Sequence, residues 1–222
     1  MKLIYIPKYQ KEKTPFKITQ IIQRVIKHEK IDGLIFLPGF MSRTQITIKD
    51  FVTEMQNLGV SKKIVLLFNG MNGFFQLPSK QSILQEHLNQ FSQNNRTINF
   101  TQNKNLIDHR KMLFFFKEKS LFSKDLSLTK DKYQAFLSSI EIVGLLIGSS
   151  NQSFATYFST AQKGEADLLM LHDGASFKNY HIDTKEKEKN GKGTLIMAKS
   201  DSISDSDEYF KNILRDIFEN SF

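Results

Sequence analysis

The chain has 222 residues, of which 40% are hydrophobic, and it contains no cysteine. This composition can fill a buried core and argues against disorder throughout, while the missing cysteine excludes disulfides and thiolate metal sites. The net charge of +8 arises in the first half, because residues 1–111 hold 17 Lys and Arg against 7 Asp and Glu, and the remainder holds 14 against 16. A basic half suits a polyanionic partner such as nucleic acid, although a solvated lysine-rich surface has the same composition.

Hydropathy argues against export and membrane insertion. The apolar run in MKLIYIPKYQKEK is too short for a secretory signal. No stretch approaches the roughly twenty apolar residues of a membrane helix. We therefore expect a soluble, cytoplasmic protein without a membrane partner.

Strands and helices are expected to alternate along the chain. In order, the strands are predicted at 2–6, 33–37, 63–68, 97–101, 110–116, 142–147, 166–171 and 194–199, and the helices at 16–28, 48–58, 79–91 and 205–218. Apolar strands separated by helices predict an α/β sandwich, with a mixed, mostly parallel sheet and helices on both faces. We expect one domain over 1–222, with longer functional connections or insertions near 117–139 and 172–193.

A histidine and a lysine stand two residues apart at the start of a strongly apolar segment. His109 and Lys111 open the stretch HRKMLFFF, which is predicted to be a strand. Residues two apart on a strand point to the same face, so the imidazole and the ammonium would lie side by side. A second such pair, His28 and Lys30, ends a helical pattern and is expected to be a solvated face or a helix cap.

Two further polar features lie beside predicted strands. Gly148, Ser149, Ser150 and Asn151 follow the apolar stretch IVGLLI, and a turn of small polar residues is their simplest explanation. Glu165 comes fourteen residues after Asn151 and leads into the apolar stretch ADLLML. A carboxylate that enters a buried strand needs a partner.

The remaining histidines carry less information. His87, His172 and His181 have no carboxylates at metal-ligand spacing, so a zinc site is not expected. His172 and Asp173, which follow the strand after Glu165, are candidates for the rim of a site.

Together these features resemble the phospholipase D superfamily. The resemblance consists of His109-x-Lys111 on a strand, a later strand ending in G-S-x-N at Asn151, and the acidic Glu165 about a dozen residues beyond, and it covers roughly 106–171. The family's fuller motif, HxKxxxxD, has an aspartate where this chain has Phe116. That departure favours the metal-independent, restriction endonuclease-like branch, and the resemblance implies a phospholipase D-like sandwich.

The chemistry of the family explains the histidine. A phosphodiester is anionic, so the attacking group must be nucleophilic while uncharged, as neutral imidazole is near its ordinary pKa of about 6.5. His109 is the predicted nucleophile and would form a phosphohistidine that water releases. The leaving alkoxide needs a proton, best supplied by a second imidazole. Because the chain has one such motif, the resemblance implies a homodimer with a single shared site.

The other motif residues would stabilise charge. Lys111 and Asn151 would hold the non-bridging oxygens, and either Ser149 or Ser150 could add a hydroxyl donor. Glu165 would orient an imidazole through its other nitrogen. With two lysines and two asparagines in the shared site, no divalent metal or other cofactor is required.

The basic first half and the missing aspartate favour DNA as the substrate. We expect an endodeoxyribonuclease, and a sequence-specific restriction enzyme, a relaxed nuclease and a fragment of a larger enzyme all stay open. Two alternatives belong to other classes: a non-catalytic DNA-binding or scaffold protein, and a phospholipid phosphodiesterase or phosphatidyl transferase.

Overall fold

The computed structural model describes residues 1–7, 18–37, 63–68, 96–101, 111–120, 132–148, 166–180, 196–199 and 205–219. In chain order, the elements in these ranges are β1 (Lys2–Pro7), α1 (Ile18–Glu29), β2 (Gly33–Leu37), β3 (Lys63–Phe68), β4 (Arg96–Thr101), β5 (Met112–Glu118), α4 (Tyr133–Ser139), β6 (Ile140–Gly148), β7 (Ala166–Leu171), the 3-10 turn η1 (Phe177–Tyr180), β8 (Ile196–Lys199) and α6 (Ser206–Glu219).

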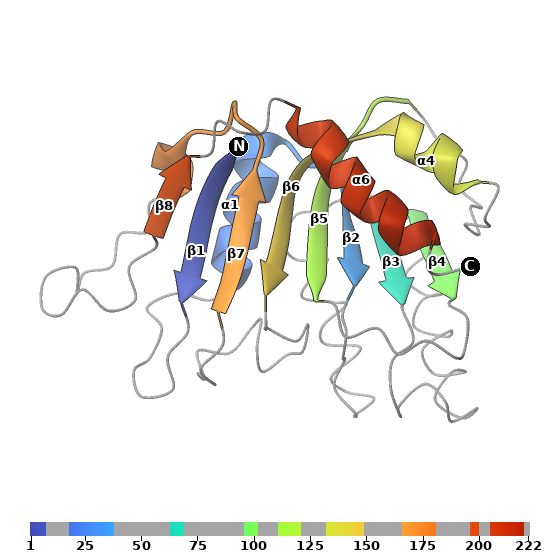
Figure 1. The fold of residues 1–222 in the computed structure, drawn as a ribbon, viewed down its shortest axis with the longest axis horizontal. Coiled ribbons are helices and arrows are strands. Elements are labelled where there is room, and N and C mark those ends of the chain that lie inside the picture. The colour runs from blue at the N-terminus through green and yellow to red at the C-terminus, as the bar shows by residue number, and fades with distance from the viewer. Residues whose placement is uncertain are drawn as a thin grey trace, which may run out of the picture.

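The strands of the described ranges form one eight-stranded sheet, in the order β4-β3-β2-β5-β6-β7-β1-β8 (Figure 1). The β2–β3 and β3–β4 pairs are parallel. The other five pairs, from β2–β5 across to β1–β8, are antiparallel. The predicted fold class, a phospholipase D-like sandwich with a mostly parallel sheet, is therefore wrong.

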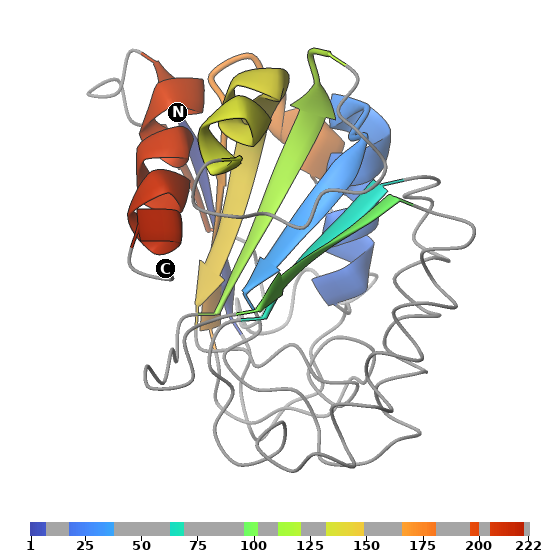
Figure 2. The ribbon, with the colours of Figure 1, turned by 90° about the vertical axis from the view of Figure 1, so that its right-hand side faces the viewer.

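The error has a physical cause. Strands of a parallel sheet are apolar throughout because helices cover both of their faces. The prediction inferred the converse, that strands which are apolar throughout are parallel. Helices lie on both faces of this sheet as well (Figure 2), so its strands are apolar whatever their direction. An intervening helix does not fix the direction either, because α4 separates β5 from β6 and these strands are antiparallel.

On one face, α4 and α6 cover the centre of the sheet (Figure 2). Phe116 of β5 packs edge-on against Phe136 of α4, with ring centroids 6.2 Å apart, and Phe136 packs in the same way against Phe218 of α6 at 6.3 Å. All three side chains are fully buried. Edge-to-face pairs of this kind stabilise a core beyond the apolar area that they bury.

The opposite face is covered by α1. Its buried apolar side chains follow helical spacing, at Ile18, Ile21, Ile22, Val25 and Ile26. Alternation along β5 sends Leu113 and Phe115 to this face and Phe114 and Phe116 to the other. The phenylalanine run is thus buried on both sides, as the sequence predicts.

Gly144 allows β6 to approach β7 closely. A Cβ atom at this position would lie 2.8 Å from a side-chain carbon of Leu171 and 3.0 Å from the carbonyl oxygen of Met170. The register shifts beside it, because Phe115 pairs with Gly144 and Phe116 pairs with Ile142, which leaves Val143 as a β-bulge. The glycine in IVGLLI therefore has a packing role.

The first turn of α6 is joined to the sheet by Asp207. One carboxylate oxygen of Asp207 accepts a hydrogen bond from the backbone N–H of Ile142 at 2.8 Å, and the other accepts from Lys119 at 3.0 Å and Lys211 at 3.1 Å. Burial alone would raise the pKa of Asp207, but these three donors lower it below its usual value. The carboxylate is thus held ionised where β5, β6 and α6 meet.

A buried carboxylate, Glu29, joins α1 to the segment after β7. Glu29 accepts a hydrogen bond from the Tyr180 hydroxyl at 2.6 Å, and its other oxygen lies 2.6 Å from His172 Nε2. Burial would raise the pKa of Glu29, but His172, Tyr180 and the charge of Lys117 lower it overall. Burial and the same carboxylate raise the pKa of Tyr180.

Most predicted elements in the described ranges are confirmed, with ends shifted by up to two residues. One assignment is wrong: α4 lies in the predicted 117–139 connection. The predicted helices 48–58 and 79–91 lie outside the described residues. None of the helices in the described ranges is long and apolar enough to cross a membrane.

Replacing Asp207 by asparagine should lower the free energy of unfolding by about 1–3 kcal/mol at neutral pH, because two charge-assisted hydrogen bonds lose their charge. A carboxyl whose pKa is depressed on folding stabilises the protein above its unfolded pKa, so the difference from wild type should shrink below about pH 4. Urea unfolding at pH 7 and pH 3 measures both effects. Glu208→Gln is the control, because Glu208 is exposed and its Arg215 contact is 3.5 Å long; a loss as large as that of Asp207→Asn would contradict the assignment.

Glu29→Gln and His172→Gln should each destabilise the protein, and the double variant should lose less than the sum of the two. We expect a coupling of about 1–2 kcal/mol, because the two side chains are direct hydrogen-bond partners and Glu29 is buried. The contribution of the Glu29 charge is present above its unfolded pKa and is lost as the pH falls through the lower, folded value. Denaturant unfolding of the four proteins measures the coupling, and strictly additive losses would contradict it.

Candidate functional site

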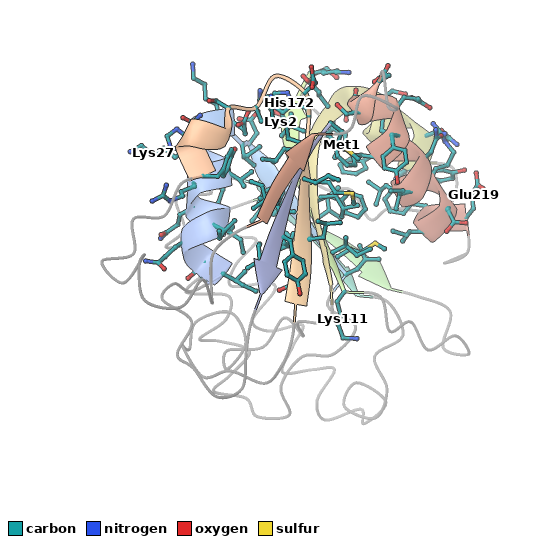
Figure 3. All side chains as sticks on the ribbon, turned by 60° about the vertical axis from the view of Figure 1, so that its left-hand side comes forward. Met1, Lys2, Lys27, Lys111, His172 and Glu219 are labelled. Atoms are coloured by element: carbon teal, nitrogen blue, oxygen red, sulfur yellow. The ribbon has the colours of Figure 1, made fainter. Side chains whose placement is uncertain are left out.

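Three strand ends meet at one end of the sheet. The backbone N–H of Gly148, the last residue of β6, donates a hydrogen bond to the carbonyl of Lys111, just before β5, at 3.3 Å. Gly148 also pairs with Asp167, the second residue of β7. We call this the Lys111 end of the sheet; Lys111 lies there, far from His172 and Lys2 (Figure 3).

The side chains at the Lys111 end fall on a common face. Met112, Ile147 and Leu168 pack into the cluster beneath α4 and α6. Their neighbours Lys111, Gly148 and Asp167 therefore stand on the other face, where α1 lies, because successive residues of a strand alternate. Strand pairing places these three positions in one row across β5, β6 and β7.

The exposure of the side chains changes along this row. Lys111 is partly exposed, whereas Asp167 is only 4% exposed. Ile6 of β1, which pairs with Asp167, is fully buried. The row thus runs from a cation that solvent can reach to a carboxylate inside the protein, with a glycine between them.

Among the predicted site residues, Lys111 is described and the others are not. His109, Ser149, Ser150, Asn151 and Glu165 all lie outside the described residues. The geometry that can be compared with the prediction is therefore that of the flanking strand ends. His109 precedes Lys111 by two residues, 149–151 directly follow β6, and Glu165 directly precedes β7. Each predicted residue thus belongs to a segment that is attached at the Lys111 end.

Phe116 stands at the position where the phospholipase D motif has an aspartate. Phe116 is fully buried beneath α4, on the face opposite to Lys111. An aspartate at this position would place a charge in an apolar core without reaching the face that carries Lys111.

Two other histidine predictions can be judged. His172 and Asp173 were candidates for the rim of the site, but they follow the far end of β7 and lie at the opposite end of the sheet from Lys111 (Figure 3). The prediction for His28 and Lys30 is confirmed. His28 is exposed in the last turn of α1, and Lys30 has a φ of 54°, while the Ile31 N–H bonds the Ile26 carbonyl as in a Schellman cap.

Asp167 is the residue that sequence reasoning missed. It lies within the apolar stretch ADLLML, and an acidic residue on a strand predicted to be buried is itself a signal. Within the described ranges, no group of three or more His, Cys, Asp or Glu side chains is placed to bind a metal ion.

No protein-family model matches the chain, and no curated protein matches it significantly. The resemblance to the phospholipase D superfamily therefore rests on the sequence motifs alone.

Proposed function

We propose that this protein is a metal-independent DNA endonuclease of the restriction endonuclease-like type, which cleaves phosphodiesters through a covalent phosphohistidine. One observation carries the proposal. The strand ends next to the His-x-Lys, GSSN and glutamate motifs meet in one row at the Lys111 end. In the sequence these motifs are spread over residues 109–165, and antiparallel pairing brings together the strand ends that flank them, which supports the proposal.

The first step is an in-line displacement. Neutral His109 attacks phosphorus, a phosphorus–nitrogen bond forms, and the bond to the leaving oxygen breaks. His109 of the partner subunit, as imidazolium, donates a proton to the leaving oxygen. Water then attacks phosphorus and gives a proton back to that imidazole, while the phosphorus–nitrogen bond breaks and His109 is regenerated.

Charge develops on the non-bridging oxygens during both displacements. Lys111 supplies a point charge from the start of β5, and Asn151 supplies an amide donor from the segment after β6. Ser149 or Ser150 adds a hydroxyl, and Glu165 holds an imidazole in the required tautomer. The side chain of Lys111 extends beyond the end of the sheet (Figure 3), and this position supports the role proposed for it.

DNA is favoured over a phospholipid headgroup by charge. The 17 basic against 7 acidic residues of 1–111 suit a long polyanion, whose phosphates bind by releasing counterions. The site is shared by two subunits in this proposal, because the mechanism requires two imidazoles and each chain has one His109 motif.

Wild-type protein should nick and linearise supercoiled plasmid in excess EDTA. His109→Ala should lower the rate at least about 1,000-fold because the nucleophile is lost. Lys111→Met should lower it about 100- to 1,000-fold, the usual effect of removing a donor aimed at developing charge. Agarose gels give the rates, and quenching on end-labelled DNA should trap an acid-labile, base-stable protein adduct.

The twin pair on α1 provides a matched control. His28→Ala removes an exposed histidine from the same His-x-Lys pattern and should leave the rate within about twofold. Cleavage that EDTA stops would overturn the mechanism. Salt-dependent DNA binding without cleavage would support the non-catalytic alternative, and turnover of a phosphatidyl substrate alone would support the lipid enzyme.

If the site is shared, a wild-type subunit that pairs with an inactive subunit should lose its activity. Co-refolding wild type with a ninefold excess of His109→Ala should lower the activity per wild-type subunit roughly tenfold, because random pairing leaves few wild-type homodimers. The same excess of Lys30→Ala should have no such effect. A sedimenting monomer whose activity stays linear on dilution would contradict a site built from two chains.

A further inference from the structure

The ring of His172 is held at one nitrogen and open at the other. Its Nε2 lies 2.6 Å from one carboxylate oxygen of Glu29, and the Tyr180 hydroxyl donates to the other oxygen at 2.6 Å. Burial raises the pKa of Glu29, but these hydrogen bonds lower it overall, so the carboxylate is ionised and can only accept. Nε2 therefore carries the ring proton, and the lone pair of the neutral imidazole lies on Nδ1.

Nδ1 faces a position that has no side chain. Residues 172–175 form a turn, closed by a hydrogen bond of 3.2 Å from the Ala175 N–H to the His172 carbonyl. A Cβ atom at Gly174, inside this turn, would lie 3.1 Å from Nδ1 and 3.0 Å from Cε1 of the ring. In the part of the chain that the structure describes, Nδ1 makes no hydrogen bond and is not buried, and the side chain of His172 is 26% exposed. A small electrophile can therefore reach this nitrogen.

The charges around the turn favour an anionic electrophile. The Lys2 ammonium donates a hydrogen bond to the Asp173 carbonyl, and the Met1 amine lies 3.6 Å from the Asp173 carboxylate. Lys2 and His172 lie together at this end of the sheet (Figure 3). Two cations thus flank a turn that contains one carboxylate, and this balance attracts small anions over neutral reagents.

We propose that His172 is a phosphoryl-acceptor site, at which Nδ1 attacks the phosphorus of a small phosphoryl donor such as a phosphoramidate or an acyl phosphate. The lone pair of Nδ1 forms a phosphorus–nitrogen bond, while the bond from phosphorus to the leaving group breaks and its electrons depart with that group. A phosphoramidate loses ammonia in this step, and an acyl phosphate loses a carboxylate.

Glu29 is the positioning residue of this site. The ring keeps its Nε2 proton during the attack and becomes positively charged, and the ionised carboxylate beside Nε2 stabilises that charge. The site lies at the end of the sheet opposite to Lys111, so its chemistry does not depend on the proposed nuclease activity (Figure 3).

The first test treats the full-length protein with potassium phosphoramidate at about pH 8, where exposed imidazoles are neutral. It uses the His109→Ala background, so that no label arises from the proposed nucleophile. His172 should be labelled on Nδ1 at least about tenfold faster than His28, an exposed histidine with no carboxylate partner in the described ranges. Peptide mass spectrometry identifies the residue, and phosphorus–nitrogen couplings in NMR spectra identify the nitrogen. Equal labelling of the two histidines, or label on Nε2 of His172, would overturn the proposal.

The second test removes the charge beside Nε2. Glu29→Gln should lower the rate of labelling at His172 about tenfold and leave the rate at His28 within about twofold, because only the first ring loses its stabilising carboxylate. Circular dichroism selects a temperature at which both proteins are folded. A rate at His172 that stays at the wild-type value would reject the proposed site.

A third variant covers the case in which Glu29→Gln does not fold, and it separates this site from a purely structural histidine. Gly174→Ala leaves Glu29 unchanged and places a methyl group against Nδ1, so labelling of His172 should fall about tenfold. Ser176→Ala changes an exposed position in the same segment and should leave the rate within about twofold. Labelling that is equally fast in the Gly174→Ala and Ser176→Ala proteins would contradict attack by Nδ1.

Discussion

Antiparallel pairing of β5, β6 and β7 is the constraint on which the candidate site depends. In such a ladder the start of one strand lies beside the end of the next, so Lys111, Gly148 and Asp167 become neighbours although up to 56 positions separate them in the chain. A mostly parallel arrangement of these strands would place their starts together and their ends at the far side. The strand directions that contradict the predicted fold class are thus the ones that bring together the strand ends beside the motif segments.

The two ends of the sheet differ in what holds them. At the end opposite to Lys111, Asp207 joins β6 and β5 to α6, and Glu29 joins α1 to the segment after β7. Each carboxylate has several donors and a lowered pKa, so each is ionised and fixed at neutral pH. These two carboxylates therefore tie α6 and α1 to the described part of the sheet at this end.

Local features of the fold were more predictable than its topology. The apolar runs GLIFL, KIVLLF and ADLLML gave strands with the expected ends, and the apolar spacing of α1 and α6 gave helices within two residues of the prediction. Strand direction was not readable, because burial on two faces produces the same apolar pattern in parallel and antiparallel strands. For the site, the sequence identified Lys111, which lies just before the strand with the phenylalanine run and not on it as predicted, but it overlooked the burial of Asp167. A polar residue in a buried strand becomes conspicuous when its burial and its cross-strand neighbours are known.

Phe116 and Asp167 stand on opposite faces of the sheet. From position 116 a side chain enters the core beneath α4, on the face away from Lys111. A carboxylate on β7 at position 167 is on the same face as Lys111 and in the same row. A side chain on the central strands reaches the Lys111 face only from a position that alternation directs to that face. The bulge at Val143 does not change the face to which Gly148 and Asp167 belong. Strand alternation therefore fixes the face that each of these side chains reaches, and β7 has a buried carboxylate on the face of Lys111.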